Sequence, residues 1–83
     1  MKNINLKKTH TGKLIQQKME EEGRKAEWLA KKIPCHKKHI YRIYEQEYIH
    51  PQLLERISII LQYNFFSHYY NYVNEQINIS VRG

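Results

Sequence analysis

The residues most able to make specific contacts lie in a basic stretch near the middle of the chain. Lys37, Lys38, Tyr41 and Arg42 fall within six residues, and at 100° per residue they share one face of a helix. Ile40 lies on the opposite, aliphatic face. Ammonium and guanidinium groups bind phosphates and the acceptor atoms of bases, so this face favours binding of nucleic acid.

Other residues nearby could bind a metal or take part in catalysis. His36 and His39 stand three residues apart, a usable ligand spacing, and Cys35 is adjacent. His36 is expected to point inward and His39 sideways, and only His68 offers a fourth ligand, so we expect neither metal nor other cofactor. The sequence has no nucleophile paired with a base, no paired carboxylates in an apolar setting and no glycine-rich phosphate loop. We therefore expect no enzymatic activity and no small-molecule substrate.

Apolar periodicity predicts the elements that position these side chains. Helices are expected at about 12–22, 25–32, 36–46, 51–62 and 65–75, with Gly23 and Pro34 ending the first two. The sequence thus predicts an all-α fold, a compact bundle of five helices over residues 11–75. Residues 1–10 are expected to form a flexible basic arm.

The C-terminal tail, residues 76–83, carries a different pattern. Residues 77–81 read I-N-I-S-V, an alternation that is typical of a strand. Three apolar residues cannot form a stable isolated strand. The tail is therefore expected either to be disordered or to pair as a strand with another chain.

Composition narrows the class of partner. The 83 residues include 14 Lys and Arg against eight acids, all of them Glu, which gives a net charge of +6. Such a balance favours partners with dense negative charge. A single cysteine excludes an internal disulfide framework and suits a reducing cytoplasm, and no apolar run approaches the ~20 residues of a membrane span. We expect a cytoplasmic protein without membrane association.

The stretch WLAKKIPCHKKHIYRIY, residues 28–44, could form two short helices joined by a tight turn, with the front of the second free to enter a DNA major groove. Residues 11–66 resemble the lambda-repressor-like, Xre-type helix-turn-helix family, including small bacterial transcription regulators. The matching positions are Leu29-Ala30, Ile33, Cys35, Ile40 and Ile43. The segments TGKLI at the start and LLERISIILQYNFF after the second helix add to the resemblance.

The resemblance implies a role for each cation. It makes residues 36–46 the recognition helix, in which Lys37, Lys38, Tyr41 and Arg42 read bases of double-stranded DNA. The phosphate-binding residues would be Lys7, Lys8, Arg24 and Lys25.

The chain departs from the family pattern at two places. Pro34 stands where a turn glycine is usual, and its ring favours φ near −65°, so a differently built turn is expected. Lys25 stands at the start of the second helix, where the family has a capping Ser or Thr. Ala26 replaces the usual phosphate-binding Gln.

Aromatic side chains after the main core suggest a homodimer, because Tyr is enriched at interfaces. The candidate interface residues are Ile59, Tyr69, Tyr70 and Val73. Together these features predict a sequence-specific DNA-binding transcription regulator. The alternative is a protein-interaction module, antitoxin-like or an adaptor, on the same helical fold.

Overall fold

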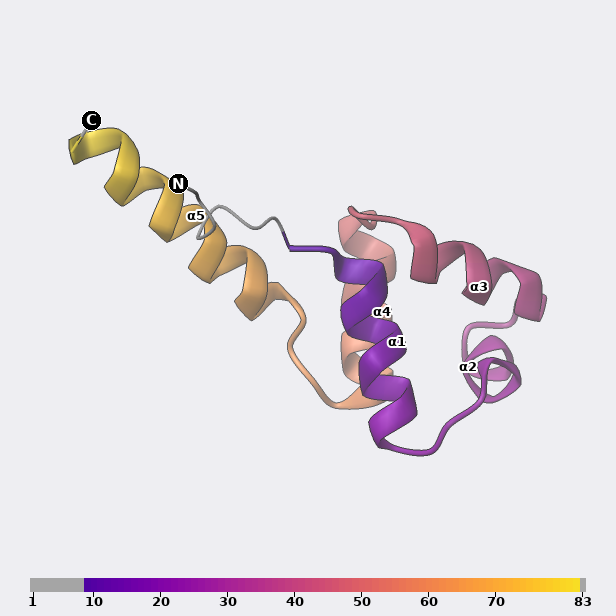
Figure 1. The fold of residues 1–83 in the computed structure, drawn as a ribbon. Coiled ribbons are helices and arrows are strands. Elements are labelled where there is room, and N and C mark those ends of the chain that lie inside the picture. Colours follow the sequence, from indigo (N-terminus) through magenta and orange to yellow (C-terminus); the bar gives the residue numbers. More distant parts are fainter. Residues whose placement is uncertain (1–8, 83) are drawn as a thin grey trace.

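The computed structural model describes residues 9–82, which form five α-helices and no strand (Figure 1). The helices are α1 (Thr11–Glu21), α2 (Ala26–Lys32), α3 (Lys37–Glu45), α4 (Pro51–Leu61) and α5 (Phe66–Arg82). The prediction of an all-α fold with five helices is confirmed. Residues 1–8, most of the predicted arm, lie outside the described part of the chain.

Histidine side chains cap the N-termini of three helices. His10, His36 and His50 precede α1, α3 and α4, and each ring Nδ1 accepts a hydrogen bond of 3.1–3.2 Å from a first-turn backbone N–H. Such an acceptor satisfies one of the unpaired N–H groups of a helix start. The expectation that His36 points inward is wrong. Its backbone is extended rather than helical, so the exposed ring turns back over the start of α3.

The same backbone turn ends α1, α2 and α4. After each helix a backbone N–H reaches back five residues to a carbonyl: Arg24 to Met19 at 2.9 Å, Cys35 to Ala30 at 2.9 Å, and Tyr63 to Ser58 at 3.0 Å. This Schellman arrangement requires a residue in the left-handed region, usually glycine. Gly23, with φ of 67°, supplies it after α1, so the predicted C-cap is confirmed.

Pro34 occupies that position between α2 and α3, with φ of 25°. The turn keeps the hydrogen bond from Cys35 to Ala30, but Pro34 has no N–H to donate the second bond of this motif. Gly23 and Gln62 make that second bond at the ends of α1 and α4, so the turn at Pro34 is built differently in this respect. The hydrogen bond from Cys35 to Ala30 requires a positive φ, which the proline ring resists. The turn is therefore strained.

The hydrophobic core takes side chains from α1 to α4 and from Phe65, just before α5. The fully buried apolar side chains are Ile15, Met19, Leu29, Ile40, Leu54, Ile57 and Phe65. Ile33 and Cys35, on either side of the turn, are partly buried against this core. The predicted stripe of α4 is confirmed, since Leu54, Ile57 and Leu61 are buried.

A close backbone contact fixes α3 against α1. The N–H groups of Thr11 and Gly12 donate to the carbonyls of Glu47 and Gln46 at 3.0 and 2.9 Å. A Cβ on Gly12 would lie 2.3 Å from the carbonyl oxygen of Ile43, so only glycine allows this approach. The start of α1 therefore sets the position of the C-terminal end of α3.

Helix α5 continues through the residues of the predicted tail. Residues 76–82 are helical, so the expectation of a disordered tail or a strand is wrong. The helix projects away from α1–α4 (Figure 1), and the molecule measures 46 × 23 × 19 Å along its principal axes. Along the described part of the chain, no helix is both long and apolar enough to cross a bilayer.

Candidate nucleic-acid interface

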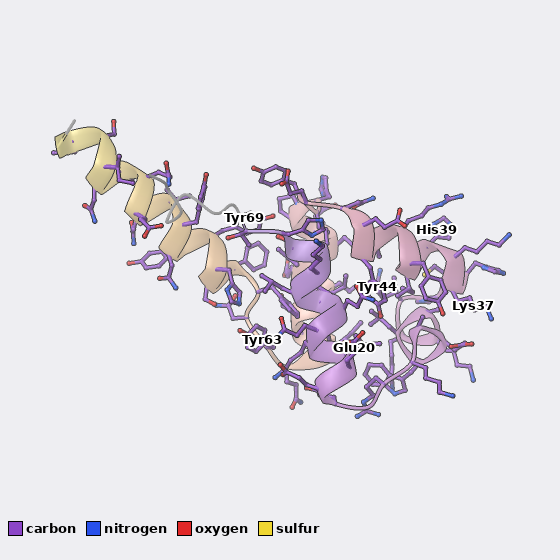
Figure 2. The ribbon with its side chains drawn as sticks, viewed as in Figure 1. Glu20, Lys37, His39, Tyr44, Tyr63 and Tyr69 are labelled. Carbon is purple, nitrogen blue, oxygen red and sulfur yellow. The ribbon has the colours of Figure 1, made fainter. Side chains whose placement is uncertain are left out.

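The four predicted base-reading side chains share one exposed face of α3. These are Lys37, Lys38, Tyr41 and Arg42. Ile40 and Ile43 are buried on the opposite face, which holds the helix to the core. Glu45 is also exposed, near the C-terminal end. Figure 2 shows Lys37 at the start of α3, beside α2 and on the side of the molecule away from α5.

Lys37 is paired with an acid on α2. Its Nζ lies 3.4 Å from Oε2 of Glu27, and both side chains are about half exposed. A hydrogen bond from its own backbone N–H and the Lys37 ammonium hold the pKa of Glu27 below its usual range. Glu27 therefore stays ionised and competes with any phosphate for Lys37.

Two cations, one just before α2 and one at its end, lie close to an indole ring on α2. The guanidinium carbon of Arg24 lies 4.1 Å from the centre of the Trp28 ring, and Nζ of Lys32 lies 5.5 Å from it. Both cations are exposed, so the ring holds them in place at the surface. Lys25 is exposed at the N-cap of α2 and makes no side-chain cap, as its charge leads one to expect.

Tyr41 and Arg42 border different hollows on the two sides of α3. Tyr41 helps to line a hollow of about 400 Å³ shared with His10 and Lys13 of the α1 start. Arg42 borders one of about 350 Å³ that also contains Cys35 and His39. Within residues 9–82, no group of three or more histidine, cysteine or carboxylate side chains is placed to hold a metal ion.

Tyr41 also contacts Tyr44, edge to face, with ring centres 6.1 Å apart. Burial raises the pKa of Tyr44, and nearby Tyr41 and Glu20 add to the shift. Tyr44 is thus a neutral packing residue that supports Tyr41 from below, while the Tyr41 ring stays 51% exposed.

Three of the four predicted dimer-interface residues are exposed, and the fourth is partly buried. Ile59, Tyr70 and Val73 are exposed by 68%, 69% and 48%. Tyr69 instead packs within the chain, because its ring stacks on Tyr48 and its hydroxyl accepts a hydrogen bond from Thr11. Tyr69 is only partly exposed, so its place at a dimer interface stays a prediction.

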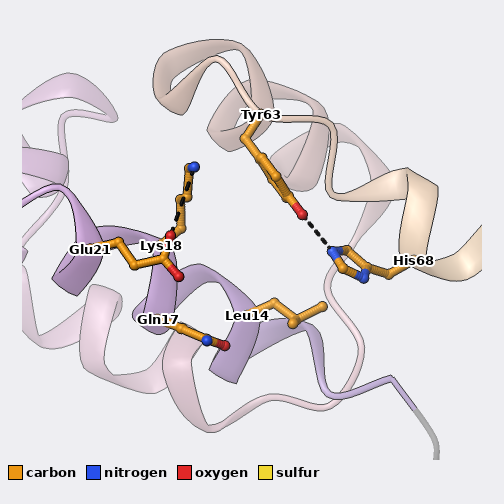
Figure 3. A pocket seen from close by; sticks show the side chains of 6 residues that line it. All are labelled: Leu14, Gln17, Lys18, Glu21, Tyr63 and His68. Atoms are coloured by element: carbon orange, nitrogen blue, oxygen red, sulfur yellow. Dashed lines mark hydrogen bonds and ion pairs between the residues drawn. The ribbon is translucent and has the colours of Figure 1, made fainter.

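A small hollow of about 180 Å³ lies where α5 begins (Figure 3). Its lining includes Lys18, Glu21, Tyr63 and His68. The Tyr63 hydroxyl and His68 Nε2 are 2.9 Å apart, and Lys18 Nζ lies 4.7 Å from the Tyr63 ring centre. These side chains contact one another, and their contacts join the start of α5 to α1 and to the segment after α4.

Two exposed lysines at the end of α2 were not predicted as site residues. Lys31 and Lys32 directly precede the turn and add to the charge beside α3. Their adjacency to the turn was visible in the sequence and could have identified them. Lys7 and Lys8 lie outside the described residues, so their phosphate-binding role stays a prediction.

The chain was also compared with known proteins. No family model, no curated protein and no solved structure matches it.

Proposed function

We propose that this protein is a sequence-specific regulator of transcription that binds double-stranded DNA. In this proposal α2, the turn at Pro34 and α3 act as a helix-turn-helix, and α3 enters the major groove. Lys38, Tyr41 and Arg42 face the bases. Arg24 and Lys25 bind the flanking phosphates.

The observation that carries the proposal is the concentration of positive charge around α2 and α3. Residues 24–42 contain seven of the fourteen Lys and Arg and only one of the eight Glu. All seven cations are exposed. A surface of this kind attracts phosphates at long range and holds them at contact.

The shape of α3 also supports the proposal. A single helix with its side chains is about 10–12 Å in diameter, which matches a major groove about 12 Å wide and 8.5 Å deep, and the nine residues of α3 span about 14 Å along it. Its first turn contains no acid. The partial positive charge of the helix N-terminus thus adds to that of the lysines.

The alternative is a protein-interaction module, and the ion pair between Glu27 and Lys37 favours it. A surface that binds only phosphate gains nothing from an acid beside its cations. The half-exposed Tyr41 would suit a protein partner as well as a groove.

Selection from a pool of random duplex DNA at low and moderate salt tests the proposal. We expect a short motif to be enriched. Affinity for that motif should fall with salt at a slope of about −0.9 per phosphate neutralised. Lys38→Glu should weaken binding about 5- to 150-fold, the loss expected for one base contact.

Arg56→Glu is the matched control, because it makes the same change of net charge at an exposed position on α4. Equal weakening by both variants would mean that binding depends only on overall charge. If nothing is enriched, the face of α3 does not read DNA and the protein-interaction alternative is favoured.

Glu27→Gln provides a test in the opposite direction. It frees Lys37 and removes a negative charge from the site, so affinity for the selected DNA should rise about 2- to 5-fold at low salt. A loss of affinity would show that the pair holds Lys37 in a DNA-binding position.

A further inference from the structure

An exposed apolar stripe runs along α5. It consists of Tyr70, Val73, Ile77 and Val81 and begins at Phe66, which is partly buried against the core; these residues are spaced three or four apart and therefore lie on one face of the helix. Tyr70, Val73, Ile77 and Val81 are exposed by 69%, 48%, 52% and 80%. The stripe extends over about 22 Å of helix at 1.5 Å per residue.

The sequence of α5 gives it little helical stability of its own. Within residues 9–82, the side-chain hydrogen bonds and ring contacts that join α5 to the other elements involve His68 and Tyr69, in its first turn. Residues 73–81 are rich in β-branched residues and asparagine, which disfavour an isolated helix. Packing along the stripe would supply the missing stabilisation.

A shallow apolar hollow lies at the N-terminal end of the stripe. It has a volume of about 300 Å³ and lies between α4 and α5, with Ile59 and Phe66 in its lining. Phe66 belongs to both the hollow and the stripe, so the two surfaces are continuous. Val81, the most exposed residue of the stripe, lies at its other end.

We propose that a second copy of this chain pairs with α5 in antiparallel orientation. In a two-fold symmetric pair, each surface of one copy meets the complementary surface of the other. The midpoint of the stripe falls between Val73 and Asn74. Antiparallel pairing about this point places Val81 of each copy over the hollow of the other. The exposed apolar side chain at one end of the stripe then covers the apolar hollow at the other end.

The low charge of α5 and the area that pairing would bury both support a second copy of the chain as the partner. Only Glu75 and Arg82 are charged among the 17 residues of α5, so two copies can approach along it despite a net charge of +6 each. A paired strip about 22 Å long buries roughly 500 Å² per copy, and covering the hollows brings it towards the ~800 Å² of a standard interface. Helices α2 and α3 lie at the far end of the molecule and stay uncovered (Figure 1).

Sedimentation equilibrium of the full chain, without DNA, tests the pairing independently of the proposed function. We expect a dimer at micromolar concentration. Val73→Glu should raise the dissociation constant at least 100-fold, because two-fold symmetry brings the two carboxylates together at the centre. Asn71→Glu, exposed on α5 but off the stripe, is the matched control and should stay dimeric.

Cross-linking tests the orientation in a background where Cys35→Ser removes the native thiol. Val73→Cys should form an intermolecular disulfide rapidly under mild oxidation. Val81→Cys should not, because antiparallel pairing keeps the two Val81 positions roughly 20 Å apart. Fast cross-linking of Val81→Cys overturns the antiparallel geometry.

A wild-type chain that stays monomeric at about 200 µM, well above the micromolar range expected for the dimer, overturns the proposal. Equal dimerisation of the two Glu variants does so as well. Either result would mean that the stripe does not pair with a second copy of this chain. Thermal unfolding by circular dichroism verifies that each variant keeps its fold, which is expected because Val73 lies outside the core.

Discussion

Replacing Gly12 by alanine should destabilise the protein strongly, although alanine is the better helix former. The new Cβ would lie 2.3, 2.4 and 2.7 Å from the carbonyl oxygens of Ile43, Tyr44 and Gln46. These are backbone atoms, so no rotamer change can relieve the overlap. Restoring an ordinary carbon–oxygen distance of about 3.3 Å requires α1 and α3 to separate by roughly 1 Å.

That movement breaks the hydrogen bonds that join the two helices. The bonds from Thr11 and Gly12 to the end of α3 would lengthen from 3.0 and 2.9 Å to about 4 Å, too long for a hydrogen bond. Losing them costs about 0.5–1.5 kcal/mol each, and overpacking adds about 1–3 kcal/mol. The better helix propensity of alanine returns about 0.5–1 kcal/mol. The net loss is about 1–5 kcal/mol, centred near 3 kcal/mol, and this central value corresponds to roughly 10–25 °C in Tm for a domain of this size.

Urea unfolding followed by far-UV circular dichroism measures this loss. Gly23→Ala is the control, because its φ of 67° makes alanine unfavourable by about 1 kcal/mol while no atom lies within 4 Å of the new Cβ. We expect Gly12→Ala to lose clearly more than Gly23→Ala. If Gly12→Ala is neutral or stabilising, α1 and α3 do not meet at this distance and the reasoning fails.

Three further predictions concern the neighbourhood of α3. His36→Asp should raise the free energy of unfolding by about 0.5–1 kcal/mol, because a carboxylate caps a helix and meets its dipole favourably, yet it should weaken DNA binding; parallel changes in stability and affinity would contradict this. Pro34→Gly should raise Tm by about 4–8 °C, since relief of the ring strain exceeds the added entropy of the unfolded chain, and a lower Tm would mean that the turn is not strained. The lowered pKa of Glu27 means that its carboxylate stabilises the fold above the unfolded value of 4.5 and loses this effect as the pH falls. Urea midpoints of Glu27→Gln should therefore lie below those of the parent at pH 7, and the difference should shrink as the pH falls below 4.5. A difference that stays constant with pH would exclude the linkage.

Helical periodicity was sufficient to predict the elements and most of the core. The pattern of α4 is regular, and its buried residues follow directly from a spacing of three and four. The exposed face of α3 was predicted for the same reason. A helix must bury one side, and the apolar residues Ile40 and Ile43 lie on only one side of this helix.

The wrong predictions share a physical cause. A local sequence pattern carries no information about the neighbouring segments that decide the conformation of a residue. A helical wheel placed His36 inside, but a residue at the N-cap does not follow the wheel. Residues 77–81 alternate like a strand, but a helix already formed at Phe66 extends through them without a new nucleation step. Glu27 and Lys37 lie ten residues apart, on two helices joined by a turn. The spacing rules for side-chain pairs within one helix therefore could not predict their ion pair.

The histidine caps connect the stability of the fold with the proposed interface. Aspartate is among the strongest N-caps, yet the chain contains none, and α3 begins with a neutral imidazole instead. An aspartate at His36 would place a negative charge beside Lys37 and Lys38, where a phosphate would bind. A neutral acceptor satisfies the backbone N–H and leaves the positive potential of the helix start intact. At this position, the weaker cap is the one compatible with binding an anion, and this accounts for a histidine where stability alone favours aspartate.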